Sequence, residues 1–315
     1  MRRKEHDALD PHLKEGYRRC AELTWRYGTT YFWGAALLPR DRRRHVYAIY
    51  ALCRLADDIV DLPDEKPAET LGVAERLDSF ADAFHTALTE RTSDDPVIAA
   101  IANTVVTCGI EADCFDRFFG AMAMDLTISS YETWEDLCGY MEGSAAVIGE
   151  MMLPVLEPQD PAAKAPARAL GLAFQLTNFL RDVNEDLDRG RVYLPQADLR
   201  QFGVDLEVRR VTSEFRALMT YEIERNRALY DFADIGIGML PPRSARCVGN
   251  ARVLYSRILD RIEHRDYDVF SGRVRVPSWR KALTTACIMV AGPRVVQVPV
   301  EERARSTSHV TSDAS

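Results

Sequence analysis

The sequence lacks any segment that would carry a protein across a membrane. None of its uncharged apolar runs approaches the roughly 18–20 residues of a membrane-spanning helix. The first ten residues, MRRKEHDALD, lack the apolar core of a signal peptide. We therefore expect a cytoplasmic protein, and we leave open a peripheral contact with the inner face of the membrane.

Cysteine pairs and excess positive charge are also missing. The seven cysteines are odd in number and include no CxxC pair, which argues against a disulfide framework and a cysteine metal site. His45 and His264 stand among arginines and are expected on the surface rather than as metal ligands. The formal net charge of −8 argues against a nucleic-acid partner, because binding a duplex needs a basic surface.

Alternating strand patterns are absent as well, and helical spacing takes their place. The segment RVRVP at 273–277 is too short to carry a sheet. Phe115, Phe119, Met122 and Leu126 recur on one face of a helix. The sequence therefore predicts one all-α domain at residues 15–290, with an N-terminal extension at 1–14 and a polar, disordered tail at 298–315.

A first acidic stripe lies in YAIYALCRLADDIVDLP, residues 47–63. On a helix, which turns by about 100° per residue, Arg54, Asp57, Asp58 and Asp61 fall within an arc of about 100°. The rest of the segment is apolar, so the stripe is expected to face a polar feature within buried surroundings.

A second acidic stripe lies in QLTNFLRDVNEDLDRGRVYLP, residues 175–195. Carboxylates four residues apart on a helix repel by roughly 0.2–0.5 kcal/mol per pair, a penalty that an external cation would remove. Gly190 is the predicted stop of this helix. An arc of about 80° contains Gln175, Asn178, Asp182, Asp186 and Arg189, with Arg181 and Glu185 on the adjoining shoulder.

Either stripe alone could be a solvated charged surface. The apolar remainder of both helices, the use of short Asp rather than Glu, and the arginines within each stripe favour a binding site instead. Carboxylates with arginines fit a diphosphate bridged by magnesium, an ion that keeps few protein carboxylates and takes its other ligands from phosphate and water. Departure of that diphosphate would leave an allylic carbocation.

The two stripes resemble the paired aspartate-rich signatures of the squalene/phytoene synthase family of head-to-head prenyl transferases. Other segments match the family in the same order. YGTTYFWGAALLP (27–39) resembles its N-terminal active-site turn, GAMAMDL (120–126) its Met-Asp-Leu helix, and YMEGSAAVIGEMMLPVL (140–156) its pocket helix. RVLYSRILDRIEHRDYDVFSGRVRVP (252–277) resembles its C-terminal helix and basic loop. The resemblance covers roughly residues 15–285, and residues 26–63 look most like the bacterial phytoene synthases.

The resemblance implies a class I isoprenoid synthase bundle around a central cavity, and it implies roles for the matching residues. Magnesium, or manganese in its place, would be held by Asp57, Asp61, Asp182 and Asp186, with Asp58 and Asn178 in support. Diphosphate oxygens would be contacted by Thr30, Arg54, Arg181, Tyr255 and Arg273. The cavity near the cations would be lined by Tyr50, Tyr140 and Gln175. Asp125 of the Met-Asp-Leu segment is left without a definite role.

The sequence departs from the family pattern at two places, and the first of them bears on substrate length. The pocket motif commonly reads Ala-Gly-Thr-Val-Gly, whereas this chain has Ala-Ala-Val-Ile-Gly at 145–149, which would narrow or dry the cavity. Gly28 stands where a serine is frequent. Neither departure touches an expected metal carboxylate.

The implied reaction joins two geranylgeranyl diphosphates into phytoene through a cyclopropylcarbinyl diphosphate. No NADPH is expected, because phytoene synthesis does not consume it and the sequence has no convincing dinucleotide loop. One alternative is a relative that uses farnesyl diphosphate to make squalene, dehydrosqualene or presqualene diphosphate. A terpene cyclase or chain-elongating synthase is a weaker alternative. A cyclase would need Ser or Thr and then Glu at the second and third positions of an N-x3-S-x3-E triad, where this chain has Asp182 and Asp186. A catalytically silent helical scaffold is disfavoured because both sets of aspartates are retained.

Overall fold

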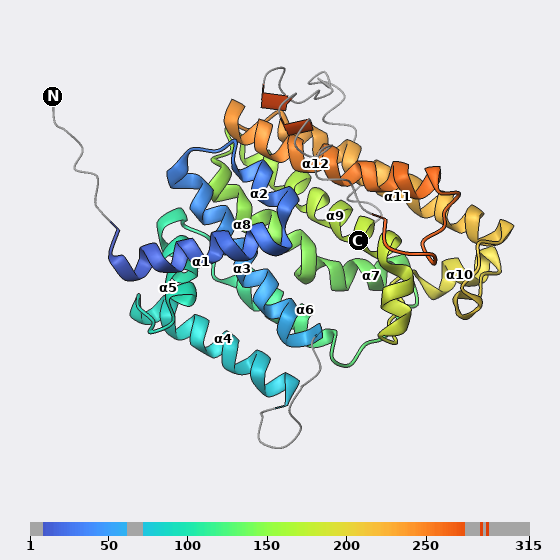
Figure 1. Ribbon diagram of the computed structural model, residues 1–315, viewed down its shortest axis with the longest axis horizontal. Helices are drawn as coiled ribbons and strands as arrows, with labels where there is room; N and C mark the ends of the chain where they lie inside the picture. Colours follow the sequence, from blue (N-terminus) through green and yellow to red (C-terminus); the bar gives the residue numbers. More distant parts are fainter. Residues whose placement is uncertain (1–8, 62–71, 275–283, 286–287, 290–315) are drawn as a thin grey trace. The chain divides into compact units, whose positions relative to one another are not determined.

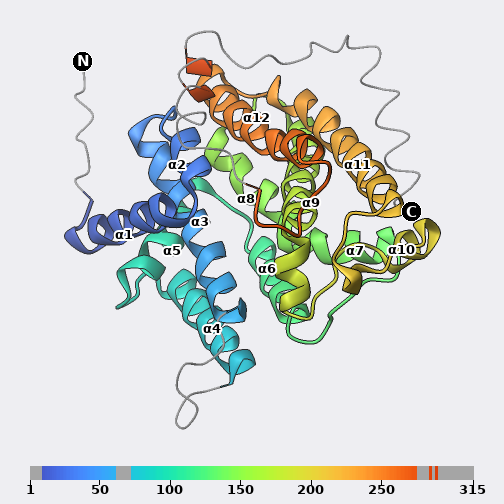
Figure 2. The ribbon, with the colours of Figure 1, turned by 45° about the vertical axis from the view of Figure 1, so that its right-hand side comes forward.

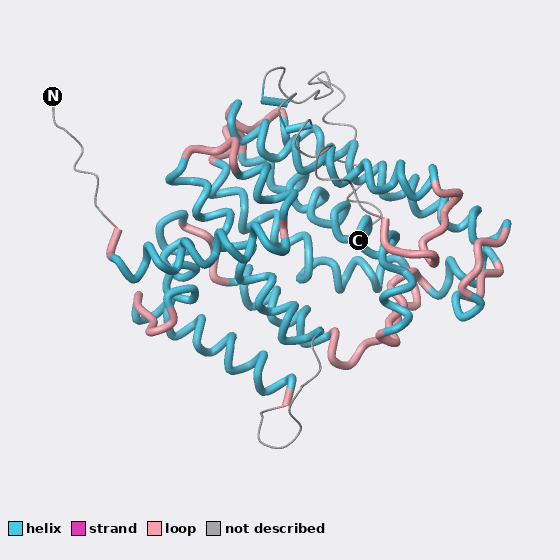
Figure 3. The backbone as a smooth tube through the Cα atoms, viewed as in Figure 1, coloured by secondary structure: helices cyan, strands magenta, loops and turns pink. Residues whose placement is uncertain are grey.

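Helices make up nearly all regular structure in the part of the chain that the computed structural model describes, which is residues 9–61, 72–274, 284–285 and 288–289. Over those ranges the backbone in Figure 3 alternates between helices and loops, without a strand. An isolated parallel bridge joins Ser130 and Val192. The all-α class expected from the sequence is therefore confirmed. Within the same ranges, no helix has the length and apolar character needed to cross a bilayer.

Two compact units divide the chain, Met1–Ala112 and Asp113–Ser315, called the N-terminal and C-terminal units below. The helices of the N-terminal unit are α1 (Pro11–Tyr27), α2 (Thr29–Ala35), α3 (Arg40–Asp61), α4 (Val73–Glu90) and α5 (Pro96–Cys108). Asp10 and Asp95 start α1 and α5, because each carboxylate accepts a hydrogen bond from the backbone N–H two residues later. Helix α3 packs against α1, α4 and α5, which bury its apolar side.

His45 of α3 is buried, so its expected surface position was wrong. Its Nδ1 lies 2.9 Å from the Thr104 hydroxyl and 3.4 Å from the Tyr17 hydroxyl. Burial, and then the nearby positive charge of Arg44, lowers the pKa of His45 to about 4. The neighbouring arginines were a poor guide, because adjacent residues on a helix point in different directions. His264 is exposed, as expected.

The C-terminal unit is built around its longest helices. Its elements are α6 (Asp113–Met124), α7 (Trp134–Met141), the π-helical turn η1 (Glu142–Ala146), α8 (Val147–Leu156), η2 (Pro161–Ala163), α9 (Lys164–Asp188), α10 (Gln196–Phe202), η3 (Leu206–Val208), α11 (Ser213–Ile237) and α12 (Pro242–His264). Helix α9 packs against α8, α11 and α12, and Figures 1 and 2 show α11 and α12 beside it.

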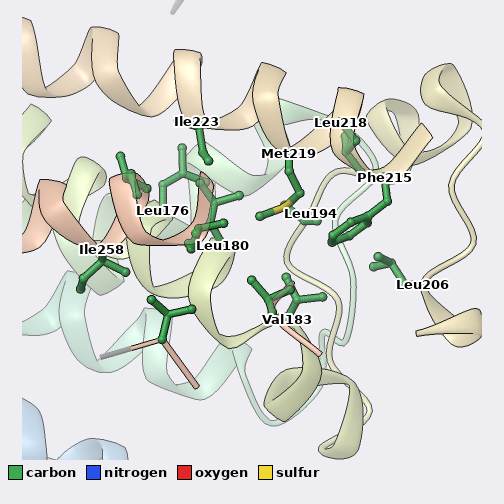
Figure 4. Close-up of a cluster of buried hydrophobic side chains, with 14 of the residues drawn as sticks. Leu176, Leu180, Val183, Leu194, Leu206, Phe215, Leu218, Met219, Ile223 and Ile258 are labelled. Carbon is green, nitrogen blue, oxygen red and sulfur yellow. The ribbon is translucent and has the colours of Figure 1, made fainter. Parts of the chain in front are cut away.

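The core of the C-terminal unit follows from helical spacing on α9. Leu176, Leu180 and Val183 repeat at intervals of four and three residues and pack with Phe215 and Met219 of α11 (Figure 4). This packing turns the opposite side of α9, which carries the second acidic stripe, away from the core.

Several predicted helix faces and helix ends can be compared with the structure. Phe115, Phe119 and Met122 are buried on one face of α6, as predicted, but α6 ends at Met124, so Leu126 lies in the turn that follows. Gly190 comes just after α9 with a φ of +72°, which confirms the predicted stop. Helix α1 begins at Pro11, within the expected extension at 1–14. The expected tail at 298–315 lies outside the described residues, and the domain bounds stay a prediction.

Candidate active site

The first acidic stripe occupies the last two turns of α3. Arg54 Nε donates a hydrogen bond to Asp58 Oδ2 at 3.2 Å, one helical turn away. The Arg54 guanidinium also lies over the Tyr27 ring, 4.3 Å from its centre. Asp57 is exposed, and Asp61 is the final residue of the helix. The predicted helix and the grouping of Arg54 with these acids are therefore present.

Tyr50 lies one turn before Arg54 on α3 and covers the start of α2. Its ring centre is 5.5 Å from that of Tyr31. A Cβ atom built on Gly28 would lie only 2.4 Å from Tyr50 Cζ. Thr30 follows in the first turn of α2 and is partly buried. Because Gly28 has no side chain, the Tyr50 ring can pack directly against the backbone at this position. Gly28 is also the residue that departs from the family pattern.

The second acidic stripe is partly buried along α9. Asp182 accepts a hydrogen bond from Arg181 Nε at 2.7 Å and another from Arg273 Nη2 at 2.7 Å. Arg273 lies beyond α12 and also approaches Glu185 at 3.4 Å. Burial by itself would lower the pKa of Arg181, but the hydrogen bond to Asp182 and the negative charges around it together raise that pKa above its usual value. The structure therefore brings together three of the predicted site residues.

The remaining predicted residues of α9 and α12 lie along the same helices. Gln175, Asn178 and Asp186 are all partly buried on α9. Tyr255 of α12 packs its ring 4.4 Å from that of Phe174, the residue before Gln175. This ring contact places Tyr255 next to the part of α9 that carries the second acidic stripe.

Tyr140, at the end of α7, belongs to a buried aromatic cluster with Tyr131, Phe179 and Tyr193. Its hydroxyl donates a hydrogen bond to Asp125 Oδ2 at 2.7 Å. Burial, and then the negative charge of Asp125, raises the pKa of Tyr140 well above its usual value, so the phenol stays neutral. Sequence reasoning missed Tyr131 and Tyr193, although Tyr193 lies inside the stretch 175–195 that carries the second stripe.

A small pocket is lined by residues of both the aromatic cluster and the acidic stripe. Asp186, Phe179, Arg191 and Tyr193 are among its lining residues. An expected metal carboxylate and two aromatic rings therefore border the same space in the C-terminal unit. Carboxylate oxygens can bind a metal and ring faces can stabilise a cation, and both kinds of group occur here.

The altered pocket motif lies where the polypeptide changes its helical form. Ala145 and Ala146 are buried within η1, the π-helical turn between α7 and α8. Gly171 of α9 passes so close that a Cβ atom on it would lie 2.2 Å from the Ala145 carbonyl oxygen. Turns of this kind are frequent at functional sites. The expected narrowing of the cavity by these alanines stays a prediction.

The donor set fits a hard divalent cation. Asp57, Asp61, Asp182 and Asp186 offer carboxylate oxygens and Asn178 an amide oxygen, the ligand types that Mg²⁺ prefers. The first two belong to α3 in the N-terminal unit and the other three to α9 in the C-terminal unit. That the two stripes face each other across a cavity stays a prediction.

Comparison with known proteins gives a consistent result. A family model described as squalene/phytoene synthase matches residues 25–280 and so runs through both units. The chain is 34% identical to a 15-cis-phytoene synthase from Synechococcus elongatus, over 88% of this chain and 94% of that protein. It is 36% identical to a chloroplastic phytoene synthase from Daucus carota, over 86% of this chain and 69% of that protein.

Solved structures resemble the fold. A squalene synthase from Alicyclobacillus acidocaldarius matches with a TM-score of 0.73 and 29% identity, covering 82% of this chain and 97% of that one. A dehydrosqualene synthase in complex with ligand matches with a TM-score of 0.79 and 25% identity, covering 87% of this chain and 95% of that one.

Proposed function

We propose that this chain, which belongs to the squalene/phytoene synthase family of prenyltransferases, joins two geranylgeranyl diphosphates head to head to make phytoene for carotenoid biosynthesis. Its similarity to phytoene synthases over most of its length is the observation that carries the proposal. The two acidic stripes, each with arginine beside the carboxylates, support a reaction in which a metal-bound diphosphate leaves.

The site residues divide into two groups by charge. The acids Asp57, Asp61, Asp182 and Asp186, assisted by Asp58 and Asn178, would hold Mg²⁺ or Mn²⁺. When bound, the metal neutralises charge on the departing diphosphate. The diphosphate oxygens would be held by Arg54, Arg181 and Arg273 through charge-assisted hydrogen bonds, with Thr30 and Tyr255 as hydroxyl donors. Tyr50, Tyr140 and Gln175 would line the cavity beside them.

The proposed reaction loses two diphosphates and two protons. One substrate ionises at C1, and the 2,3 double bond of the second substrate attacks the cation; loss of a proton gives a cyclopropylcarbinyl diphosphate. This intermediate ionises, rearranges and loses a second proton to give phytoene. Ring faces stabilise such desolvated cations by about 0.5–2 kcal/mol. The product is far more apolar than the substrates, so we expect it to leave into a membrane.

A product assay tests the substrate. Purified protein with magnesium is supplied with C15 and C20 diphosphates, with and without NADPH, and the hydrocarbon is identified by mass. We expect phytoene from the C20 substrate, independent of NADPH. Dehydrosqualene or squalene from the C15 substrate alone would favour the alternative function, which the similarity to a squalene synthase and a dehydrosqualene synthase supports.

Metal removal tests the mechanism class. EDTA is expected to stop diphosphate release, and added Mg²⁺ or Mn²⁺ to restore it, because the proposed site uses carboxylates that cannot neutralise the leaving group themselves. A protein that releases no diphosphate in excess magnesium from either substrate would instead support the silent scaffold.

A further inference from the structure

Asp125 joins three segments of the C-terminal unit that the sequence separates. It lies just after α6 and is partly buried. Its Oδ2 accepts the hydroxyl proton of Tyr140 at 2.7 Å and its Oδ1 that of Tyr193 at 3.3 Å. One carboxylate therefore fixes a tyrosine at the end of α7 and another in the loop that follows α9.

Further hydrogen bonds to backbone carbonyl oxygens reinforce the same junction. Arg191 Nη2 donates to the Asp125 carbonyl oxygen at 3.4 Å, and Val192 N donates to the Ser129 carbonyl oxygen at 2.7 Å. The Gln196 N–H donates to the Tyr131 carbonyl oxygen at 2.9 Å. The loop after α6 and the loop after α9 are thus held side by side, with the Asp125 carboxylate beside them.

The two anchored tyrosines form part of a stack of rings that reaches the pocket of Asp186. The Tyr140 and Tyr193 ring centres are 5.8 Å apart, and Tyr193 stacks on Phe179 at 3.9 Å with an angle of 11°. Phe179 and Tyr193 line that pocket together with Asp186. Asp125 thus anchors two rings of a stack that borders the same pocket as an expected metal carboxylate. This ring stack is called the ring wall below.

We infer that Asp125 is a positioning residue, whose carboxylate holds Tyr140 and Tyr193 so that the ring wall beside Asp186 keeps its shape while a carbocation is present. This inference rests on the proposed function and adds a role for a residue outside the predicted site set. A wall that shifts admits water and exposes the cation to it, so loss of the anchor would divert intermediates to alcohols or release them early.

Tyr131 supplies an internal control within the same cluster. Its ring centre is 5.3 Å from that of Tyr140. Its hydroxyl is buried, and within the described part of the chain it has no hydrogen-bond partner. Removing the Tyr131 hydroxyl therefore breaks no bond to Asp125, whereas removing that of Tyr193 breaks one.

The test compares D125L, D125N, Y193F and Y131F by product ratio, measured as alcohols plus released cyclopropyl intermediate relative to final hydrocarbon. This ratio does not depend on how much enzyme is folded. We expect D125L to raise it by about tenfold, D125N and Y193F to raise it less, and Y131F to leave it unchanged. In the D125L/Y193F double variant the two effects should not add, because both act through one contact. Should D125L not fold, D125N and Y193F carry the comparison.

A second measurement separates this inference from the proposed function. With ¹³Cζ-labelled tyrosine, D125N should shift the NMR signals of Tyr140 and Tyr193, assigned from the Phe variants, and leave that of Tyr131 in place. An unchanged product ratio, an equal change in Y131F, or unmoved tyrosine signals would overturn the role of Asp125. Absence of any hydrocarbon from the unaltered protein, with the NMR shifts present, would overturn the proposed function while the anchoring by Asp125 stands.

Discussion

Arg273 Nη2 donates a hydrogen bond to Asp182 Oδ2 across 2.7 Å, although the two residues are 91 positions apart in the sequence. Asp182 is expected to hold metal and Arg273 to hold diphosphate. Since a bridged metal–diphosphate ligand needs both kinds of group within bonding distance, the contact supports their assignment to one ligand.

The aspartates of both stripes are predicted to be essential for turnover. Asp57→Ala or Asp182→Ala should lower diphosphate release by about 10²–10³-fold or more, because each removes a carboxylate that would hold the metal, and the metal neutralises the leaving group. Asp188→Asn, at an exposed position later on α9, is the matched control and should retain activity. Circular dichroism checks that the helices remain. Normal release from either alanine variant would contradict the metal assignment.

Arg273 is predicted to contribute mainly to substrate binding. Arg273→Gln should raise KM for the prenyl diphosphate by about tenfold, the scale of a lost hydrogen bond to a charged group. Steady-state kinetics with Arg210→Gln, an exposed arginine of the same unit, provides the comparison. Equal KM values for the two variants would remove Arg273 from the diphosphate site.

Gly28 is predicted to set the position of Tyr50. Gly28→Ser should lower turnover by about 10–100-fold, because the new Cβ atom would lie 2.4 Å from the Tyr50 ring and displace it. Gly72→Ser is the control, since the nearest atom to its Cβ atom in the described part of the chain would be Glu75 Oε2 at 3.9 Å. If Gly28→Ser leaves turnover unchanged, catalysis does not depend on packing of the Tyr50 ring against the backbone at position 28.

Gly171 is predicted to be required for packing of α9 on η1. Gly171→Ala should destabilise the protein by about 1–3 kcal/mol, since its Cβ atom would lie 2.2 Å from a backbone oxygen that cannot easily move. Gly120→Ala on α6 has no described atom within 4 Å of the new methyl group and should stabilise by roughly 0.5–1 kcal/mol. Urea unfolding measures both. Opposite signs are expected, and a neutral Gly171→Ala would show that the helices can separate freely.

Glu222 is predicted to make stability fall as pH rises. It is fully buried on α11, and burial raises its pKa to about 8 despite hydrogen bonds from Arg225. The folded state therefore keeps a proton that the unfolded chain releases near pH 4.5. The contribution of Glu222 to the free energy of unfolding is complete below that pH and is lost as the pH rises to about 8.

Urea unfolding between pH 5 and 8 tests this effect of Glu222. Glu222→Gln should flatten the decline relative to the unaltered protein, because glutamine does not titrate. Glu224→Gln, at an exposed position on the same helix, should leave the decline in place. Parallel pH profiles for all three proteins would show that Glu222 ionises normally in the folded state.

The sequence by itself determined the features that depend on the geometry of a single helix. The spacing of Leu176, Leu180 and Val183 predicts which side of α9 is buried, and the same spacing places Asp182 and Asp186 on the other side. Gly190 marks the helix end because it adopts a left-handed conformation at low cost. These features need only neighbours within a few residues, so they could be predicted without coordinates.

Contacts between distant segments were decided by tertiary structure. The pairing of Asp182 with Arg273, the support of Tyr140 and Tyr193 by Asp125, and the burial of His45 each depend on how helices pack. Periodicity fixes which direction a side chain takes around its own helix, but it carries no information about which partner occupies that direction. Only the tertiary arrangement of the chain supplies the partner.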